Sequence, residues 1–291
     1  MTRLDDRTTR LMKMAVAMST TVALILISTK TWAYWSTGSL SLLGSLMDSV
    51  LDGMTSIINL FAVRYAIVPA DHDHKYGHGK VESLAALGQS AFMIGSAVVL
   101  VLNSFNSLLD KREVVNTDAG IFVSVLAIVL TLGLVSFQQY VIRQTKSVVI
   151  EADSLHYKGD LLMNLSVIVA LALASVGWAW SDQVFAIGIA IFLMVSAWKV
   201  GNRAWEDLMD QQLPELEQQV VELVDKLEGA QGCHDVRCRQ SGPNQFIQLH
   251  LELDGAMTLT EAHAIGDQLE RQIRERHPRA DVIVHHDPTD K

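Results

Sequence analysis

The chain has 291 residues, of which 49% are hydrophobic and 19% charged, and its formal net charge is −9. This apolar content excludes an intrinsically disordered chain, and the acidic balance leaves no basic footprint for nucleic acid. Two cysteines, Cys233 and Cys238, are too few for a disulfide scaffold. The mean hydropathy of +0.24 is high for a soluble protein and low for one that lies wholly in a membrane, which indicates a mixed protein.

The apolar residues are segregated into six runs, each long enough to cross the roughly 30 Å of a bilayer's hydrocarbon as a helix. They cover 11–33, 39–65, 82–108, 117–140, 148–178 and 183–203. The first run is too long for a signal peptide, and no small-residue cleavage site follows it. We therefore predict an α-helical membrane protein with six transmembrane helices in residues 11–205, after a tail of residues 1–10.

Basic residues are distributed unevenly between the two sides of these runs. They gather in the N-terminal tail, after the second and fourth runs and at the end of the sixth, with Lys111 and Arg112 as the exception. Because short cytoplasmic loops are enriched in Lys and Arg, this pattern predicts that both termini lie in the cytoplasm. Both cysteines would then be kept reduced.

Two of the runs carry ionisable side chains where burial in lipid is costly. Asp48 and Asp52 lie four apart in the second run, and His156 and Asp160 lie four apart in the fifth. At about 1.5 Å per helical residue, Asp48 lies about 14 Å from the start of the second run, and Asp160 lies about 18 Å from the start of the fifth. The two runs cross the membrane in opposite directions, so both pairs reach a similar depth. Three carboxylates and an imidazole give the four ligands that Zn²⁺ takes, with Cd²⁺, Mn²⁺ and Fe²⁺ left open. Polar packing between helices is the alternative.

The loop of residues 69–80 is rich in metal-ligating side chains. It contains Asp71, His72, Asp73, His74 and His78. Their spacing is compatible with a second metal site and leaves open which of the five take part. A solvated polar loop that attracts metal weakly is the alternative.

Residues 213–291 read as helix, strand, strand, helix, strand, after a linker of residues 206–212. Pro214 marks the start of the first helix, residues 245–254 alternate as a strand does, Thr260 precedes the second helix, and 281–287 form the last strand. This predicts a small open α/β (αββαβ) domain similar to metallochaperones. Alternation places Cys233 and Cys238 on opposite strand faces as core or edge residues.

In its membrane and loop motifs the chain resembles the cation diffusion facilitator family. The matching motifs are Asp48-x-x-x-Asp52, His156-x-x-x-Asp160 and the loop of residues 69–80, and the resemblance covers nearly the whole chain. It implies a homodimer in a bacterial inner (cytoplasmic) membrane that moves a divalent cation by alternating access against protons.

The resemblance also implies four groups of site residues. The transport site is Asp48, Asp52, His156 and Asp160; the loop site is Asp71, His74 and His78; the cytoplasmic-domain site is His234, His250, His263, His285 and Asp287; and a salt bridge of Lys80 with Asp210 fastens the protomers. His286 points to the opposite strand face and is the weakest candidate in its domain, and His277 is interpreted as a helix cap.

These observations predict a secondary active transporter that exports Zn²⁺, and possibly Cd²⁺, in exchange for protons. The coupling follows because a ligand must lose its proton before it binds metal. An exporter of Mn²⁺ or Fe²⁺ with the same architecture is the alternative, and a membrane-anchored metal sensor is the alternative from another class. An enzyme is not expected, because H-E-x-x-H is lacking, and no G-x-x-x-x-G-K nucleotide loop is present.

Overall fold

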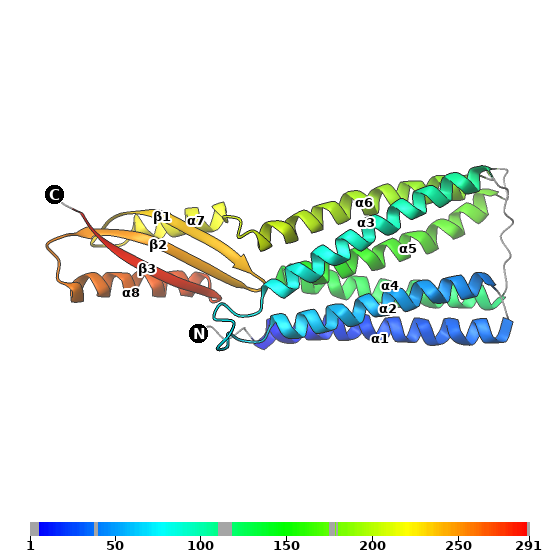
Figure 1. Cartoon of the computed structure of the whole chain (residues 1–291), viewed down its shortest axis with the longest axis horizontal. Helices are drawn as coiled ribbons and strands as arrows, with labels where there is room; N and C mark the ends of the chain where they lie inside the picture. The colour runs from blue at the N-terminus through cyan, green and yellow to red at the C-terminus, as the bar shows by residue number, and fades with distance from the viewer. Residues whose placement is uncertain (1–5, 38–39, 110–117, 175–177, 179, 290–291) are drawn as a thin grey trace. The chain divides into compact units, whose positions relative to one another are not determined.

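The structure is a computed structural model that describes residues 6–37, 40–109, 118–174, 178 and 180–289 (Figure 1). Its helices are α1 (Asp6–Thr37), α2 (Leu40–Ala66), α3 (Lys80–Leu109), α4 (Asp118–Thr145), α5 (Val148–Ala174), α6 (Ser181–Leu208), α7 (Pro214–Val224) and α8 (Leu259–Arg276). Its strands are β1 (Ala230–Ser241), β2 (Asn244–Asp254) and β3 (Ala280–Thr289). The predicted fold class, a helical membrane region followed by an αββαβ domain, is confirmed.

The chain divides into two compact units. A helical unit contains Arg7–Ala66 and Val81–Trp205, and a C-terminal unit contains Met1–Asp6, Ile67–Lys80 and Glu206–Lys291. The loop between α2 and α3 therefore groups with the C-terminal domain and not with the helices that it connects.

All six predicted membrane runs form helices, and five of these are long and apolar enough to span a bilayer over their described residues. These five segments are Arg7–Ser36, Ser45–Ala66, Lys80–Phe105, Phe122–Thr145 and Gln183–Leu208. The fifth run forms α5, whose described residues include four charged side chains in its first half, at Glu151, Asp153, Lys158 and Asp160. Two of the predicted ligands, His156 and Asp160, lie in this charged half of α5.

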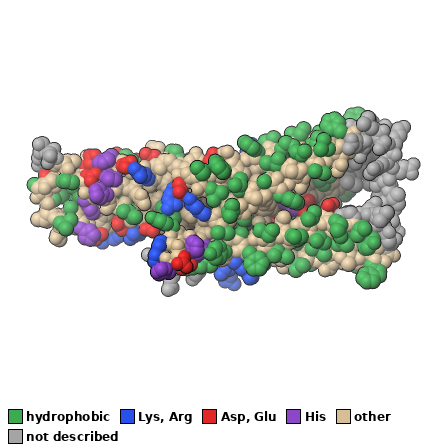
Figure 2. All heavy atoms as spheres, viewed as in Figure 1, with side chains coloured by type: hydrophobic (Ala, Val, Ile, Leu, Met, Phe, Trp, Pro, Cys, Tyr) green, Lys and Arg blue, Asp and Glu red, His purple; other side chains and the backbone are tan. Residues whose placement is uncertain are grey.

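The outer surface of the helical unit is apolar. Large side chains such as Phe61, Val129 and Trp198 are 61–68% exposed, and Figure 2 shows hydrophobic side chains spread over the visible face of these helices. A water-soluble protein does not present so much contiguous apolar surface, whereas a bilayer solvates it. The described helices therefore form a multi-pass membrane unit.

The C-terminal unit contains a three-stranded sheet in the order β1-β2-β3. Strand β1 pairs antiparallel with β2, and β2 pairs parallel with β3. Alternate residues of β2, from Ile247 to Leu253, are buried against α7 and α8, which both cover the same face of the sheet. The core contains Leu216, Val220, Leu223, Val224, Leu227, Cys238, Ile247, Leu249, Leu251, Leu253, Leu269, Ile273, Ala280 and Val282.

Two local expectations in this unit are corrected by the structure. Helix α8 begins at Leu259 and not after Thr260, because Thr258 is its N-cap and forms a capping box with Glu261. Cys233 and Cys238 do not lie on opposite faces, since both contact the core. The register of β1 shifts between His234 and Arg237, and a bulge of this kind reverses the alternation of side chains beyond it.

Burial of Cys238 generates a testable difference between the two thiols. Cys238 is 1% exposed, and burial raises the pKa of its thiol to about 11. At pH 7 only about one thiol in ten thousand would be ionised, and only the thiolate is alkylated. We expect iodoacetamide to modify Cys238 only after denaturation, with the partly buried Cys233 modified earlier in the same sample. Peptide mass spectrometry measures both, and equal rates in the folded protein would contradict this assignment.

Candidate metal sites

Three predicted ligands meet between α2 and α5 inside the helical unit. Nε2 of His156 lies 2.8 Å from Oδ1 of Asp52 and 3.8 Å from Oδ2 of Asp160. One ligand atom from each of the three lies within 4.8 Å of the others. The side chains of His156, Asp52 and Asp160 are 14%, 20% and 39% exposed, so the group is partly shielded from solvent. We call it the α2–α5 cluster.

Two glycines beside these ligands allow their helices to approach their neighbours closely. A Cβ on Gly53 would lie 2.8 Å from Ile27 of α1, and one on Gly159 would lie 2.9 Å from Leu193 of α6. Because Gly53 follows Asp52 and Gly159 precedes Asp160, the ligands are held on segments that are tightly packed on their other sides.

Asp48, the fourth predicted transport ligand, is outside the α2–α5 cluster. It lies one turn before Asp52 on α2, and its side chain is exposed. The group of three that the structure assembles is Asp52, His156 and Asp160. The prediction of four ligands thus stays a prediction for the cation-bound protein.

The loop site is assembled around Asp71. Its Oδ2 lies 3.3 Å from Nε2 of His78, and its Oδ1 lies 3.4 Å from Nδ1 of His74. The backbone N–H of His74 donates to Oδ1 of Asp71 at 2.7 Å, with a further bond from Asp73 N–H at 3.0 Å. The bond from His74 lowers the pKa of Asp71, which keeps this carboxylate in the form that binds a cation.

A second contact sets the orientation of His78. Its Nδ1 lies 3.3 Å from the carbonyl of Val68, to which it can donate, and this contact turns Nε2 toward Asp71. The side chain of His78 is 2% exposed. His72 and Asp73 instead pair with each other at 95% and 85% exposure. The structure therefore selects Asp71, His74 and His78 from the five residues that spacing alone left open.

The loop packs on the β1–β2 hairpin within the C-terminal unit. The guanidinium of Arg239 lies 5.1 Å from the ring centre of Tyr76 and 4.5 Å from that of Phe246. It also donates to Asp210 at 3.0 Å, and Asp210 pairs with Lys80 at 2.9 Å. Partial burial favours the neutral acid, but the bonds and charges from Lys80 and Arg239 lower the pKa of Asp210. The predicted Lys80–Asp210 pair thus forms within one chain, and Arg239 extends it.

The third group is a row of histidines across the C-terminal sheet. His234 of β1 pairs in register with His250 of β2, which pairs in register with His285 of β3. Adjacent rings lie 5.1 Å and 4.7 Å apart between centroids. The row lies on the face of β2 opposite the core, because His250 alternates with the buried Leu249 and Leu251.

Asp287 joins this row with both carboxylate oxygens. Oδ2 lies 2.8 Å from Nδ1 of His250 and 3.2 Å from Nε2 of His234, whereas Oδ1 lies 3.1 Å from Nε2 of His285. The hydrogen bond from His250 lowers the pKa of Asp287. A carboxylate whose two oxygens face different imidazoles has the geometry to bridge two cations. We call His234, His250, His285 and Asp287 the histidine row.

Glu252 is a functional candidate that sequence reasoning missed. Its Oε1 accepts a hydrogen bond from Nδ1 of His234 at 2.8 Å, which leaves Nε2 of that ring facing Asp287. Such outer contacts fix the orientation of metal-binding histidines. The alternation of β2 could have identified it. Leu251 and Leu253 point to the core, so Glu252 lies between them on the opposite face, which it shares with His250.

His263 is not part of the histidine row in a single chain. It lies in the second turn of α8, not the first, where its Nε2 is 3.7 Å from Oδ2 of Asp267. Its ring is 6.4 Å from that of His286, whose side chain packs against Gly266 of α8. His286 is thus on the helix side of the sheet, as predicted, and His277 is the C-cap residue of α8.

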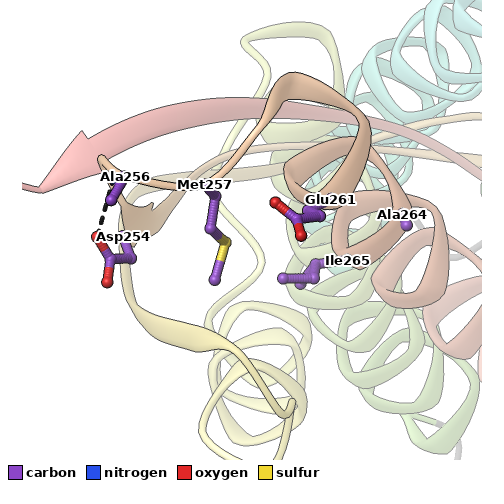
Figure 3. Close-up of a pocket in the computed structure, with 6 residues that line it drawn as sticks. All are labelled: Asp254, Ala256, Met257, Glu261, Ala264 and Ile265. Carbon is purple, nitrogen blue, oxygen red and sulfur yellow. Dashed lines mark hydrogen bonds between the residues drawn. The ribbon is translucent and has the colours of Figure 1, made fainter.

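A shallow pocket at one end of the C-terminal unit carries no comparable cluster among its lining residues. Asp254, Met257, Glu261 and Ile265 line it together with Ala256 and Ala264 (Figure 3). The carboxylate of Asp254 accepts the backbone N–H of Ala256 at 2.9 Å, and Glu261 accepts that of Thr258 at 2.9 Å. Both acids therefore stabilise the turn and the start of α8.

Comparison with known proteins agrees with this arrangement. Residues 16–209 match the cation efflux transmembrane domain, and residues 213–289 match the cytoplasmic domain of cation efflux proteins. The chain is 45% identical to the cation-efflux pump FieF of Yersinia enterocolitica, over 98% of this chain and 96% of that protein. It is 46% identical to FieF of Pectobacterium atrosepticum, over 96% of this chain and 93% of that protein. The metal-bound C-terminal domain of the CzcD transporter from Thermotoga maritima aligns with 26% of this chain and 88% of its own, at 24% identity and TM-score 0.25.

The loop site predicts a difference between two neighbouring histidines. His74→Ala should lower the number of Zn²⁺ ions bound per chain by one, because it removes a ligand that faces Asp71. His72→Ala is the matched control and should leave the stoichiometry unchanged, since His72 pairs only with the exposed Asp73 among its described contacts. Equilibrium dialysis of the full-length protein measures both. Equal stoichiometry in the two variants would exclude the site.

Proposed function

The chain belongs to the cation efflux, or cation diffusion facilitator, family, and from this premise we propose that it is a divalent cation/proton antiporter. In this proposal it exports Zn²⁺, and also Cd²⁺, from the cytoplasm of a bacterium by alternating access. Membership of the family establishes a multi-pass cation efflux transporter; the cation, the counter-ion and the direction of coupling are what we add.

The hydrogen bond between His156 and Asp52 carries the proposal. At 2.8 Å, one proton lies between Nε2 of His156 and Oδ1 of Asp52. A divalent cation needs the same nitrogen as a neutral ligand and the same oxygen as a carboxylate ligand. In this proposal the cation-free ring is an imidazolium with a proton on each nitrogen; a cation that takes Nε2 releases the proton there and leaves the proton on Nδ1. A carrier with such a site exchanges one for the other as it alternates between the two sides of the membrane.

The ligand chemistry favours Zn²⁺ without requiring it. One imidazole and two carboxylates, with Asp48 or a water as a fourth ligand, provide the N and O donors of a tetrahedral zinc site. The same donor set is harder than a thiolate site, which is why Mn²⁺ and Fe²⁺ are the closest competitors. Relative fluxes of these ions through the reconstituted protein decide between them.

We assign the C-terminal unit a regulatory role at a dimer interface. The matched cytoplasmic domain is a dimerisation domain, and the histidine row lies on the sheet face that α7 and α8 leave uncovered. The clustered carboxylates of Asp287 and Glu252 on this face disfavour close approach of two acidic copies, and bound cations would relieve that repulsion. Cytoplasmic Zn²⁺ would then favour association of the two domains, with both termini of each chain in the cytoplasm.

Coupling is tested by flux into vesicles that contain the purified full-length protein. An imposed proton gradient should drive uptake of ⁶⁵Zn, and a protonophore should abolish that drive. Zinc flux that is unchanged by the protonophore would contradict antiport, and an absence of flux in both arms would favour the membrane-anchored sensor.

A second prediction concerns Asp52. The variant Asp52→Asn cannot supply an anionic ligand, so zinc flux should fall by more than about tenfold, the lower bound for weakened metal ligation. Asp281→Asn is the control, because it removes an exposed carboxylate of β3 that lies outside all three clusters. A loss of flux confined to Asp52→Asn supports the α2–α5 cluster as the transport site, and equal flux in both variants would overturn it.

A further inference from the structure

A second buried carboxylate lies in the helical unit, separate from the α2–α5 cluster. Asp153 is 1% exposed. Its Oδ2 accepts from Oγ of Ser19 at 2.7 Å and from Nε2 of Gln138 at 2.7 Å, and its Oδ1 accepts from Nδ2 of Asn59 at 3.0 Å. Sequence reasoning passed over this residue. We call it and its polar neighbours the Asp153 cluster, which comprises Ser19, Ser56, Asn59, Gln138, Asp153 and Tyr157.

The carboxylate is held by neutral groups only: its three hydrogen-bond donors come from three other helices, and the amide of Gln89 on α3 also lies beside it. Ser19 lies on α1, Asn59 on α2 and Gln138 on α4, whereas Asp153 lies on α5. A buried carboxylate that is bonded to neutral donors, with no cation in those bonds, lacks the compensation that an ion pair would provide. In a membrane such a residue is maintained at a cost, which indicates a function beyond packing.

The side chains of this cluster can form hydrogen bonds with Asp153 both as a carboxylate and as a neutral carboxylic acid. The side-chain carbonyl Oε1 of Gln138 is buried and has no hydrogen-bond partner among the described residues. Rotation of this amide by half a turn would exchange its N–H₂ for the carbonyl, which then accepts the O–H of a protonated Asp153. A donor that can turn into an acceptor at the same position allows a proton to be bound and released without leaving a buried group unpaired.

A chain of hydroxyl groups connects this carboxylate to the neighbourhood of the transport cluster. Oγ of Ser19 lies 3.1 Å from Oγ of Ser56, which lies 3.0 Å from the hydroxyl of Tyr157. The Tyr157 ring lies 5.7 Å from the ring of His156. Each hydroxyl can donate and accept, so the chain can pass a proton from one member to the next.

We propose that Asp153 is a second proton-binding site of this transporter, distinct from the proton shared by His156 and Asp52. The carboxylate takes up one proton to become a carboxylic acid and gives up the same proton to water when the anion forms again, and the hydroxyls of Ser19, Ser56 and Tyr157 are the hydrogen-bonded groups beside it. The other titratable groups that face it are His156 and Tyr157 of α5. The other helices present neutral side chains: Ser19 of α1, Asn59 of α2, Gln89 of α3 and Gln138 of α4. This inference deepens the proposed antiport and rests on it for its role in transport.

Proton binding itself is tested without transport. Infrared difference spectra of the full-length protein in vesicles, recorded during acidification, should show the C=O band of a buried carboxylic acid. In Asp153→Asn this band should be absent. A band of unchanged size in Asp153→Asn would overturn the proposal.

Ser19→Ala is the matched variant that keeps the acid and removes one donor to its anion. A hydrogen bond to a charged group contributes about 1.5–3 kcal/mol, so the band should reach half its height at a pH higher by about one unit or more. Loss of packing alone would not shift this titration, so an unshifted band in Ser19→Ala contradicts the assignment. This variant also keeps the test decisive if Asp153→Asn does not fold.

Transport separates this inference from the antiport itself. If the proton gradient drives wild-type zinc flux, Asp153→Asn should carry fewer protons per Zn²⁺, measured with a pH-sensitive dye inside the vesicles. An unchanged ratio would overturn the role of Asp153 and leave the antiport standing. A wild-type flux that ignores the gradient would instead contradict the antiport and leave the infrared result to decide whether Asp153 binds a proton.

Discussion

The hydrogen bond between His156 and Asp52 is the constraint from which the function follows. It places one proton at the point where a cation would need two free ligand atoms. Such a site cannot hold both, and no nucleotide or further cofactor is needed to couple them. The two helices that carry these side chains are closely packed on other neighbours: α2 approaches α1 at Gly53, and α5 approaches α6 at Gly159. Their apolar outer surfaces, in turn, make the bilayer the medium in which a buried ionic site is isolated from bulk water.

The three ligand groups differ in burial, and this difference suits different tasks. The imidazole of the α2–α5 cluster, His156, is 14% exposed, whereas the imidazoles of the histidine row are from 36% to 65% exposed. An exposed row on an uncovered sheet face can respond to the concentration of cytoplasmic cation and to a second copy of the chain. The loop site has an intermediate character, with His78 buried and His74 half exposed. Because the loop packs on the β1–β2 hairpin through Arg239, the proposed loop cation would stabilise a segment that joins two membrane helices.

Helices, strands and most of the candidate ligands that the structure brings together were predictable, because periodicity and i, i+4 spacing report on local geometry. Features that depend on distant segments were not. The bulge in β1 places Cys233 on the core side. Asp235, inside this bulge, adopts the left-handed backbone conformation (φ 50°). The grouping of the loop with the C-terminal unit depends on Tyr76 meeting Arg239. Asp153 could not be recognised in the sequence, where it reads as an ordinary acid near the start of a helix. Its hydrogen-bond partners are neutral residues on other helices, and sequence spacing does not reveal them.

The central claim is that a divalent cation displaces a proton from the α2–α5 cluster. Calorimetric titration of the purified full-length protein with Zn²⁺, in buffers with different ionisation enthalpies, counts the protons released on binding. The account predicts proton release in the wild type and a smaller release in His156→Ala, with His72→Ala unchanged. Zinc binding at this cluster with no proton release, or with the same release in His156→Ala, would contradict it.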